Sequence, residues 1–316
     1  MFKYTVKRLL QSLVTILAIV TIVFLLLRML PKEYYFTEDE IQKLSAQEIH
    51  DRLELAGLND PVVVQLFRYY GQLFRLDFGT SRRLKAGTPV MELVASRFGM
   101  SMKFGMMATV ISMIIGISMG ILQTRHKDRL ADHVGTAYTI FVNAVPHLVS
   151  YSLILILGQK VLHLPSMYST RNPGPSSILP LICLCIGPIA SYALWTRRYM
   201  VDELNKDYIK LSRIKGLSSK QIMVRHVLKN AFVPMVAFVP ANFIMTIGGS
   251  LLVERFFSIP GMGPLLTDAI GRYDTNVVQA LVFIYASLGI LSVFLGDVCM
   301  MIFDPRITLA SKEGSR

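Results

Sequence analysis

The sequence predicts an all-α membrane protein with six transmembrane helices. Hydrophobic residues make up 53% of the 316 residues and charged residues only 17%, and the mean hydropathy is +0.48. A helix needs about 20 mostly apolar residues to cross the hydrocarbon core of a bilayer. Runs of this kind, which lack the alternating pattern of a barrel strand, occur at residues 9–30, 104–122, 135–157, 178–195, 232–253 and 277–303.

The basic residues predict the orientation, because short cytoplasmic loops collect Lys and Arg. The loop at 197–231 is rich in both, whereas the two short outer loops contain only Lys160, Arg171, Arg255 and Arg272. We therefore expect both termini in the cytoplasm of a multi-pass plasma-membrane protein. Topology accounts for most of the net charge of +12, so no nucleic-acid partner is expected.

Four regions follow from these spans. They are a first transmembrane helix at 1–30, an external segment at 31–100, a five-helix core at 101–303 and a cytoplasmic tail at 304–316. The core includes a cytoplasmic loop at 199–231. Cys183, Cys185 and Cys299 lie within predicted spans without a histidine cluster and are expected to be small packing residues, not metal ligands.

The external segment is expected to be helical. Thr37 and Glu40 form a capping-box pattern that predicts a helix through Ile41 and Leu44 toward Leu53. A second amphipathic helix is expected after the Asp-Pro pair at 60–61, with an apolar face of Val64, Phe67, Leu73 and Phe74. Two roles stay open for this segment: receiving an extracellular partner, or covering the outer mouth of the bundle.

Two short helices are predicted in the cytoplasmic loop. Tyr208, Leu211 and Ile214 recur at helical spacing, and Gly216 stands where a helix often ends in a left-handed residue. A second helix should begin at Ser218.

The start of that second helix carries its own signals. Ser218 and Gln221 form a capping box, and Leu217 and Ile222 occupy the positions of a hydrophobic staple. Two interpretations of the loop follow: a docking element for the groove of another protein, or a solvated basic loop that only sets topology.

The sequence contains no recognisable catalytic machinery. It lacks a G-x-x-x-x-G-K-[ST] phosphate loop, an H-E-x-x-H metal helix and a G-x-S-x-G nucleophile elbow. We expect no catalytic residue, no cofactor and no metal site in this chain. Uphill transport would take its energy from an ion gradient or from a separate ATPase.

A polar stripe marks the fifth predicted span. Asn242, Thr246, Ser250 and Glu254 repeat every four residues and predict one polar face. Pore lining and interhelical hydrogen bonding are both open interpretations of this stripe.

Small residues and a proline predict packing and bending in two other spans. Ser112, Gly116 and Gly120 form a small-xxx-small seam along which a neighbouring helix can approach closely. Pro146 frees backbone groups within the third span and predicts a bend there.

Four ordered blocks resemble one family. The loop DYIKLSRIKGLSSKQIMVRHVLKNAFVP resembles the EAA loop of ABC importer permeases, in the form that the peptide and nickel subgroup uses. Ser212 and Ile214 replace two alanines of that form, and Lys210 stands at the glutamate of the general motif. The blocks LAGLNDPVVVQLFRYYGQLFRLDFGTS, ERFFSIPGMGPLLTDAI and DPRI resemble further parts of the first permease of that subgroup.

The resemblance implies a type I ABC importer permease with several partners. These are a second, homologous permease, two cytoplasmic ABC ATPase subunits and an external binding protein, either a lipoprotein or soluble. It implies ATP-driven uptake of oligopeptides, with dipeptide or nickel import as the alternative. An ion-coupled carrier and a membrane scaffold or receptor without transport are the alternatives from other classes.

On this resemblance, the 207–230 loop couples the permease to the ATPase. Gly216 would supply the turn, and Tyr208, Leu211 and Leu217 the apolar contact. Arg213 and Lys215 would supply charge complementarity. The remaining positions that match the subgroup motif are Asp207, His226 and Asn230.

Overall fold

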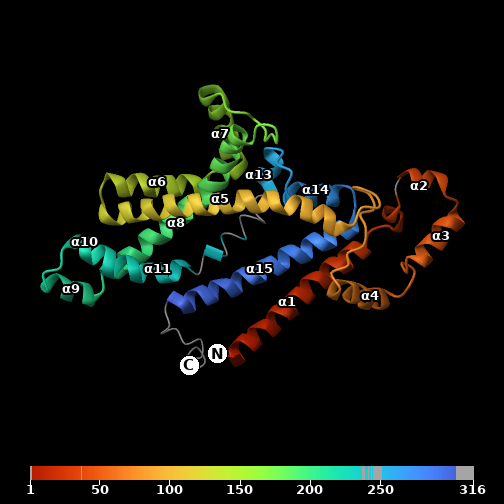
Figure 1. Cartoon of the computed structure of the whole chain (residues 1–316), viewed down its shortest axis with the longest axis horizontal. Helices are drawn as coiled ribbons and strands as arrows, with labels where there is room; N and C mark the ends of the chain where they lie inside the picture. Colours follow the sequence, from red (N-terminus) through yellow and green to blue (C-terminus); the bar gives the residue numbers. More distant parts are fainter. Residues whose placement is uncertain are drawn as a thin grey trace. The chain divides into compact units, whose positions relative to one another are not determined.

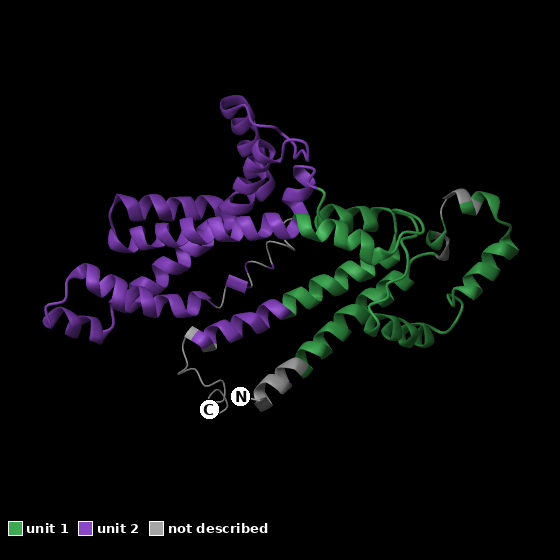
Figure 2. Cartoon of the chain, viewed as in Figure 1, with its two compact units in different colours: residues 1–100, 260–290 green, residues 101–259, 291–316 purple. Residues whose placement is uncertain are grey.

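The computed structural model describes residues 2–36, 38–236, 239–240, 242, 244 and 251–303, and most of these residues are helical (Figure 1). They form two compact units, coloured separately in Figure 2. Unit 1 comprises residues 1–100 and 260–290, and unit 2 comprises residues 101–259 and 291–316.

Four helices confirm four of the predicted spans, because they are long and apolar enough to cross a membrane. They are α1 (Phe2–Arg28), α5 (Val90–Arg125), α8 (Pro173–Leu204) and α15 (Thr275–Phe303). The fifth predicted span, at 232–253, begins within α11 (Lys229–Val236) and ends within α13 (Leu251–Phe256). Most of it lies outside the described residues.

The third predicted span is two helices instead of one. α6 (Leu130–Ala144) and α7 (His147–Leu162) meet at an angle of 113°. Pro146 is the first residue before α7 and lacks the N–H that would continue the hydrogen bonding of α6. The predicted bend is confirmed, but the prediction of one helix through 135–157 is wrong.

Unit 1 contains the segment between the first two spans. Its elements are the 3-10 helix η1 (Lys32–Tyr35), α2 (Glu38–Lys43), α3 (Ala46–Leu55) and α4 (Val62–Phe74). The prediction of one helix from Thr37 to Leu53 is wrong, and Thr37 itself lies outside the described residues. The reason is a competing capping box: the Ser45 side chain accepts a hydrogen bond from the backbone of Glu48, whose carboxylate accepts one from Ser45 N at 2.8 Å. α3 therefore begins at a start of its own.

α4 confirms the second predicted helix of this segment but not its buried face. Leu73 is buried beside Tyr69 in the core of unit 1, whereas Val64, Phe67 and Phe74 are exposed. The apolar pattern had merged two separate faces, only one of which packs against the rest of unit 1.

The predicted small-residue seam lies between α5 and α8 in unit 2. A Cβ atom on Gly116 would lie 2.6 Å from Cβ of Tyr192, and one on Gly120 would lie 2.5 Å from Cβ of Thr196. Ser112 Oγ donates to the carbonyl of Cys185 at 3.4 Å, also across this contact. The prediction is confirmed, because side chains at either glycine would push the two helices apart.

Candidate functional site

The 207–230 loop folds as the sequence predicts at the end of its first helix. α9 (Asp207–Ile214) is followed by Gly216 at φ +79°. The N–H groups of Gly216 and Leu217 donate to the carbonyls of Arg213 and Ser212 at 3.0 and 3.2 Å. This pair of bonds is a Schellman motif, which satisfies the last carbonyls of a helix and requires a left-handed residue.

The second helix also begins where its capping box predicts. Ser218 is the N-cap of α10 (Ser219–Ile222), and its backbone N–H donates to the Gln221 side chain at 3.0 Å. The chain then continues through η2 (Met223–Leu228), a π-helical stretch, into α11. The capping signals did not predict this π-helical stretch.

One side of the loop is fixed to the end of α8 by a small hydrophobic core. Ile209, Ile222 and Val227 of the loop are buried against Met200 of α8 and Ala231 of α11. Ile121 of α5 packs against the same cluster. The loop and the end of α8 therefore share one packed core, and such cores do not deform freely.

A polar network reinforces that attachment. The Tyr208 hydroxyl donates to the carboxylate of Glu203, which is 8% exposed, and accepts a hydrogen bond from Asn230 Nδ2 at 2.9 Å. Asn230 Nδ2 also donates a hydrogen bond to the Glu203 carboxylate at 3.2 Å, and Lys206 forms an ion pair with Glu203 at 3.0 Å. Burial and the hydrogen bond to Glu203 raise the pKa of Tyr208 to about 12. The sequence analysis named Tyr208 and Asn230 but missed Glu203.

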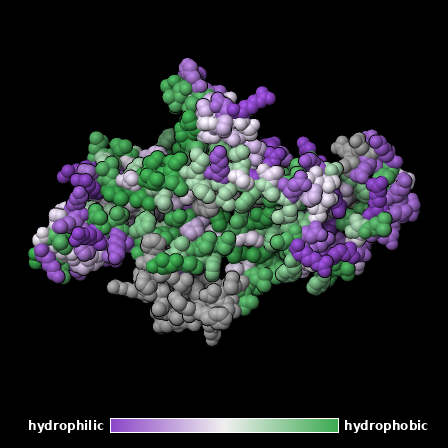
Figure 3. Space-filling view, in the orientation of Figure 1, coloured by the Kyte–Doolittle hydropathy of each residue, from purple (hydrophilic) through white to green (hydrophobic). Residues whose placement is uncertain are grey.

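The opposite side of the loop carries both apolar and basic side chains. Leu211 and Ile214 are 51% and 82% exposed, one turn apart on α9. Arg213 and Lys215 beside them are exposed too. Where Figure 1 labels α9 and α10, Figure 3 shows hydrophilic and hydrophobic surface intermixed. The predicted face of Tyr208, Leu211 and Ile214 is therefore divided: Tyr208 turns inward and the other two turn outward.

The other predicted loop residues take different places. Asp207 is exposed and pairs with Lys210 at 2.7 Å, also on the surface. His226 is half-buried, with its ring edge-on to Tyr208 at 6.4 Å. Leu217 is half-buried and packs against the hydrophobic core of the loop. Gly216 has no atom near the position of a Cβ, so its backbone conformation alone requires glycine.

An ion pair that the sequence analysis missed joins α6 to α8. Arg197 donates from Nε and Nη2 to the two carboxylate oxygens of Asp132 at 2.5 and 2.7 Å, and Asp132 is only 3% exposed. Arg197 was counted as a topology charge, although its guanidinium is engaged in this bidentate pair. Spacing could not reveal the pair, because the partners are 65 positions apart.

The predicted polar stripe is described only at its ends. Asn242 is half-buried, and Thr246 and Ser250 lie outside the described residues. Glu254 is completely buried, and its carboxylate accepts a hydrogen bond from Ser101 Oγ at 2.6 Å. Glu254 thus forms a hydrogen bond between α13 and α5, which is one of the two interpretations left open for the stripe.

A second ordered loop lies in unit 1 and was not predicted. Asp274, which is fully buried, accepts hydrogen bonds through Oδ2 from Ser81 Oγ at 2.6 Å and from three successive backbone N–H groups. These belong to Arg82, Arg83 and Leu84 and lie 3.0–3.1 Å away. Successive N–H groups that converge on one carboxylate form an anion-binding nest.

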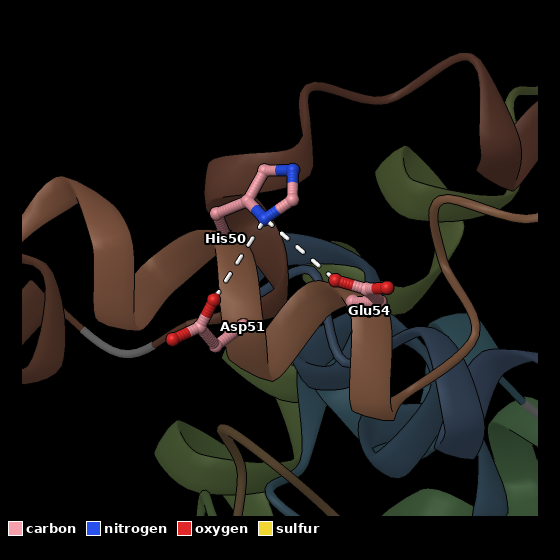
Figure 4. A group of neighbouring side chains, drawn as sticks. All are labelled: His50, Asp51 and Glu54. Carbon is pink, nitrogen blue, oxygen red and sulfur yellow. Dashed lines mark ion pairs between the residues drawn. The ribbon is translucent and has the colours of Figure 1, made fainter.

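Three exposed side chains on α3 approach one another in unit 1 (Figure 4). His50 Nδ1 lies 3.9 Å from a carboxylate oxygen of Asp51 and 3.9 Å from one of Glu54. All three are open to solvent, and exposed acidic groups commonly lie this close without an ion. We therefore do not assign a metal site to this group.

A comparison with known protein families covers the 207–230 loop and the helices around it. Residues 112–309 match the family model described as "Binding-protein-dependent transport system inner membrane component". The chain belongs to that family. The match includes the 207–230 loop, α8 and the seam between α5 and α8. As a member of this family with several apolar helices, the protein is a multi-pass protein of the bacterial plasma membrane.

Curated relatives cover nearly the whole chain. The dipeptide transport system permease protein DppB of Lactococcus lactis subsp. cremoris is 32% identical over 98% of this chain and 100% of its own length. The oligopeptide transport system permease protein OppB of Escherichia coli is 30% identical over 97% and 99%. Unit 1 therefore has a counterpart in these relatives, although the family model begins only at residue 112.

A solved structure supports the fold of the family. An inward-facing structure of the MetNI methionine ABC transporter matches with a TM-score of 0.56 at 16% identity, over 67% of this chain and 97% of that one. At this identity the match concerns the fold alone. The predicted helical fold of an ABC transporter permease is thereby confirmed for the matched part of the chain.

Proposed function

We propose that this protein is the transmembrane permease subunit of an ATP-driven peptide importer. The observation that carries the proposal is the 207–230 loop, which is fixed to α8 on one side and presents Leu211, Ile214 and Arg213 on the other. Relatives named as dipeptide and oligopeptide transport permeases over the full chain length support a peptide cargo.

The loop is proposed to act as a lever. An ATPase that binds the exposed side differently in its two nucleotide states would shift the loop. The core around Met200 and the bonds to Glu203 would pass that shift to α8. The close contacts of Gly116 with Tyr192 and of Gly120 with Thr196 would then move α5 with α8, since the two helices pack directly against each other there.

The assembly requires partners that supply what this sequence lacks. Without a phosphate loop in the chain, ATP hydrolysis is assigned to two cytoplasmic ATPase subunits. A second homologous permease would complete the pathway, and an external binding protein would deliver the solute. We propose six spans with both termini in the cytoplasm, which places the 207–230 loop on the ATPase side.

The fifth span is proposed to line part of the pathway. Its polar stripe would present Asn242, Thr246 and Ser250 to the solute. Glu254 would hold the end of the stripe in place through its bond to Ser101. Uncharged polar groups of this kind suit a peptide main chain, which both donates and accepts hydrogen bonds.

Oligopeptides are our first candidate cargo and dipeptides the second, which the relative from Lactococcus lactis favours. The test is uptake of labelled peptides of two to six residues by cells in which the chromosomal gene for this chain is deleted and a plasmid supplies the protein. Wild-type protein should restore uptake that persists when ionophores collapse the ion gradients but stops when ATP is depleted. Uptake abolished by the ionophores would favour an ion-coupled carrier, and no restored uptake of any peptide would overturn the proposal.

A further inference from the structure

One apolar face of α4 is largely exposed among the described residues of unit 1. Val63, Phe67 and Phe74 are 62%, 68% and 70% exposed, and their spacing places them on one side of the helix. An exposed apolar face of this kind marks a site of contact with another protein or with the membrane.

The opposite flank of α4 is polar. Gln65, Arg68 and Gln72 line a cavity of about 260 Å³ in unit 1, together with Arg28 at the end of α1 and Asp77. Between the two flanks, Tyr69 and Leu73 pack into the core of the unit. α4 is thus polar on one side of its buried stripe and apolar on the other.

Contacts with α1 show which part of the candidate span α4 lies beside. Tyr69 stacks on Phe24 with ring centroids 5.2 Å apart, and the Tyr70 hydroxyl lies 2.5 Å from the Thr21 hydroxyl (Figure 1 shows the two helices). Phe24 and Thr21 both lie inside the candidate span Leu10–Arg28. At 1.5 Å per residue they are about 6 and 10 Å below Arg28. These are the depths at which interfacial helices lie, with their apolar face about 5–10 Å into the boundary between headgroups and acyl chains.

The polar flank of α4 lies nearer the Arg28 end of the span, and the apolar flank lies farther from that end. The polar flank lines the cavity that Arg28 reaches, at the end of the span. Tyr70 contacts the deeper residue Thr21, and Phe67 lies edge-on to Tyr70 at 6.4 Å. The exposed apolar face is therefore on the deep side of the helix.

We propose that α4 is an interfacial membrane helix. Its face of Val63, Phe67 and Phe74 lies among the acyl chains of the leaflet at the Arg28 end of α1, and its occupant is membrane lipid. The segment between the first two spans then anchors unit 1 in this leaflet instead of projecting wholly into water. The inference depends on membrane insertion alone and not on the nature of the cargo.

The single tryptophan of the chain allows a direct test. In a Trp195→Phe background, Phe67→Trp would report on α4, and Leu55→Trp on α3 is the matched control because Leu55 is 89% exposed in the same segment. Fluorescence is measured on the full-length chain alone in nanodiscs, so that no partner subunit contributes tryptophan, with lipids brominated along the acyl chain and with aqueous acrylamide as quenchers.

We expect Phe67→Trp to emit at shorter wavelength and to lose fluorescence to the brominated lipid while resisting acrylamide. The control at residue 55 should show the reverse. Acrylamide quenching as strong at residue 67 as at residue 55 would place the face in water and overturn the proposal. Resistance to both quenchers would show that a protein covers the face, which also overturns it. Val63→Trp gives a second, independent probe if Phe67→Trp does not fold.

Discussion

Two ordered loops among the described residues, at 207–230 and at 79–90, are held in opposite ways. The 207–230 loop of unit 2 is shaped by neighbours in sequence: the Schellman turn at Gly216 and the capping box at Ser218. The 79–90 loop of unit 1 is held by Asp274, which is 193 positions away from Ser81. Local bonds leave one side of a loop free for a partner, whereas a buried distant carboxylate fixes a loop to its own unit.

The largest effect should come from Asp274→Ala. This change leaves three backbone N–H groups and the Ser81 hydroxyl without their acceptor, and each unsatisfied buried group costs about 1–3 kcal/mol. We expect faster hydrogen exchange at Arg82 to Leu84 and a lower free energy of unfolding. Asp77→Ala is the control, since exposed Asp77 accepts one bond from Gly79 in the same segment. Unchanged exchange at the three amides would contradict the account.

Tyr208→Phe should have the next largest effect. The hydroxyl bridges Glu203 and Asn230, and a hydrogen bond to a charged group contributes about 1.5–3 kcal/mol. The pKa of Tyr208 is raised to about 12, so the stability that its protonated form gives is complete below its ordinary pKa of about 10. That stability is lost as the pH rises toward 12. The difference in unfolding free energy between wild type and variant should therefore shrink over this range, and a constant difference would count against the network.

Gly216→Val should cost somewhat less stability yet abolish uptake. A side chain with a Cβ costs about 1–2 kcal/mol in the left-handed conformation at φ +79°, and relief of that strain would misplace α10. Gly216→Asn is the matched variant, because asparagine tolerates this conformation better. Membrane insertion should be normal in both. Equal uptake by the Val and Asn variants would remove the turn from the mechanism.

Ser218→Ala should have the smallest effect, about 1 kcal/mol, which is typical for loss of an N-cap. Ser219→Ala is the control, since the neighbouring hydroxyl at 218 supplies the cap. Hydrogen exchange of the α10 amides would separate the two variants, because only Ser218→Ala should speed it. Equal hydrogen exchange in the two variants would indicate that the packing of Ile222, and not the N-cap, determines where α10 begins.

The same contrast explains what the sequence could predict. Gly216, Ser218 and the spans of α1, α5, α8 and α15 were predictable because their signals are local. The seam at Gly116 was also predictable, since small residues at a spacing of four mark one helix face.

The remainder depends on partners that are distant in sequence. The pairs Asp132–Arg197 and Asp274–Ser81 join positions that spacing does not connect. Apolar periodicity alone also could not divide α4 between its buried side at Leu73 and its exposed side at Phe67. Which face of an amphipathic helix is buried depends on the neighbour it meets.

The central claim is that the free side of the 207–230 loop binds an ATPase. The direct test is gentle purification from the native membrane, followed by mass spectrometry of the bound proteins, for wild type and for a variant with both Leu211→Asp and Ile214→Asp. Leu55→Asp is the control, because Leu55 lies outside the loop and is 89% exposed. We predict that the ATPase and a second permease accompany the wild type and the control, and that the loop variant loses the ATPase but keeps the second permease. An ATPase retained at the wild-type level by the loop variant, or absent from an intact wild-type preparation, would contradict the claim.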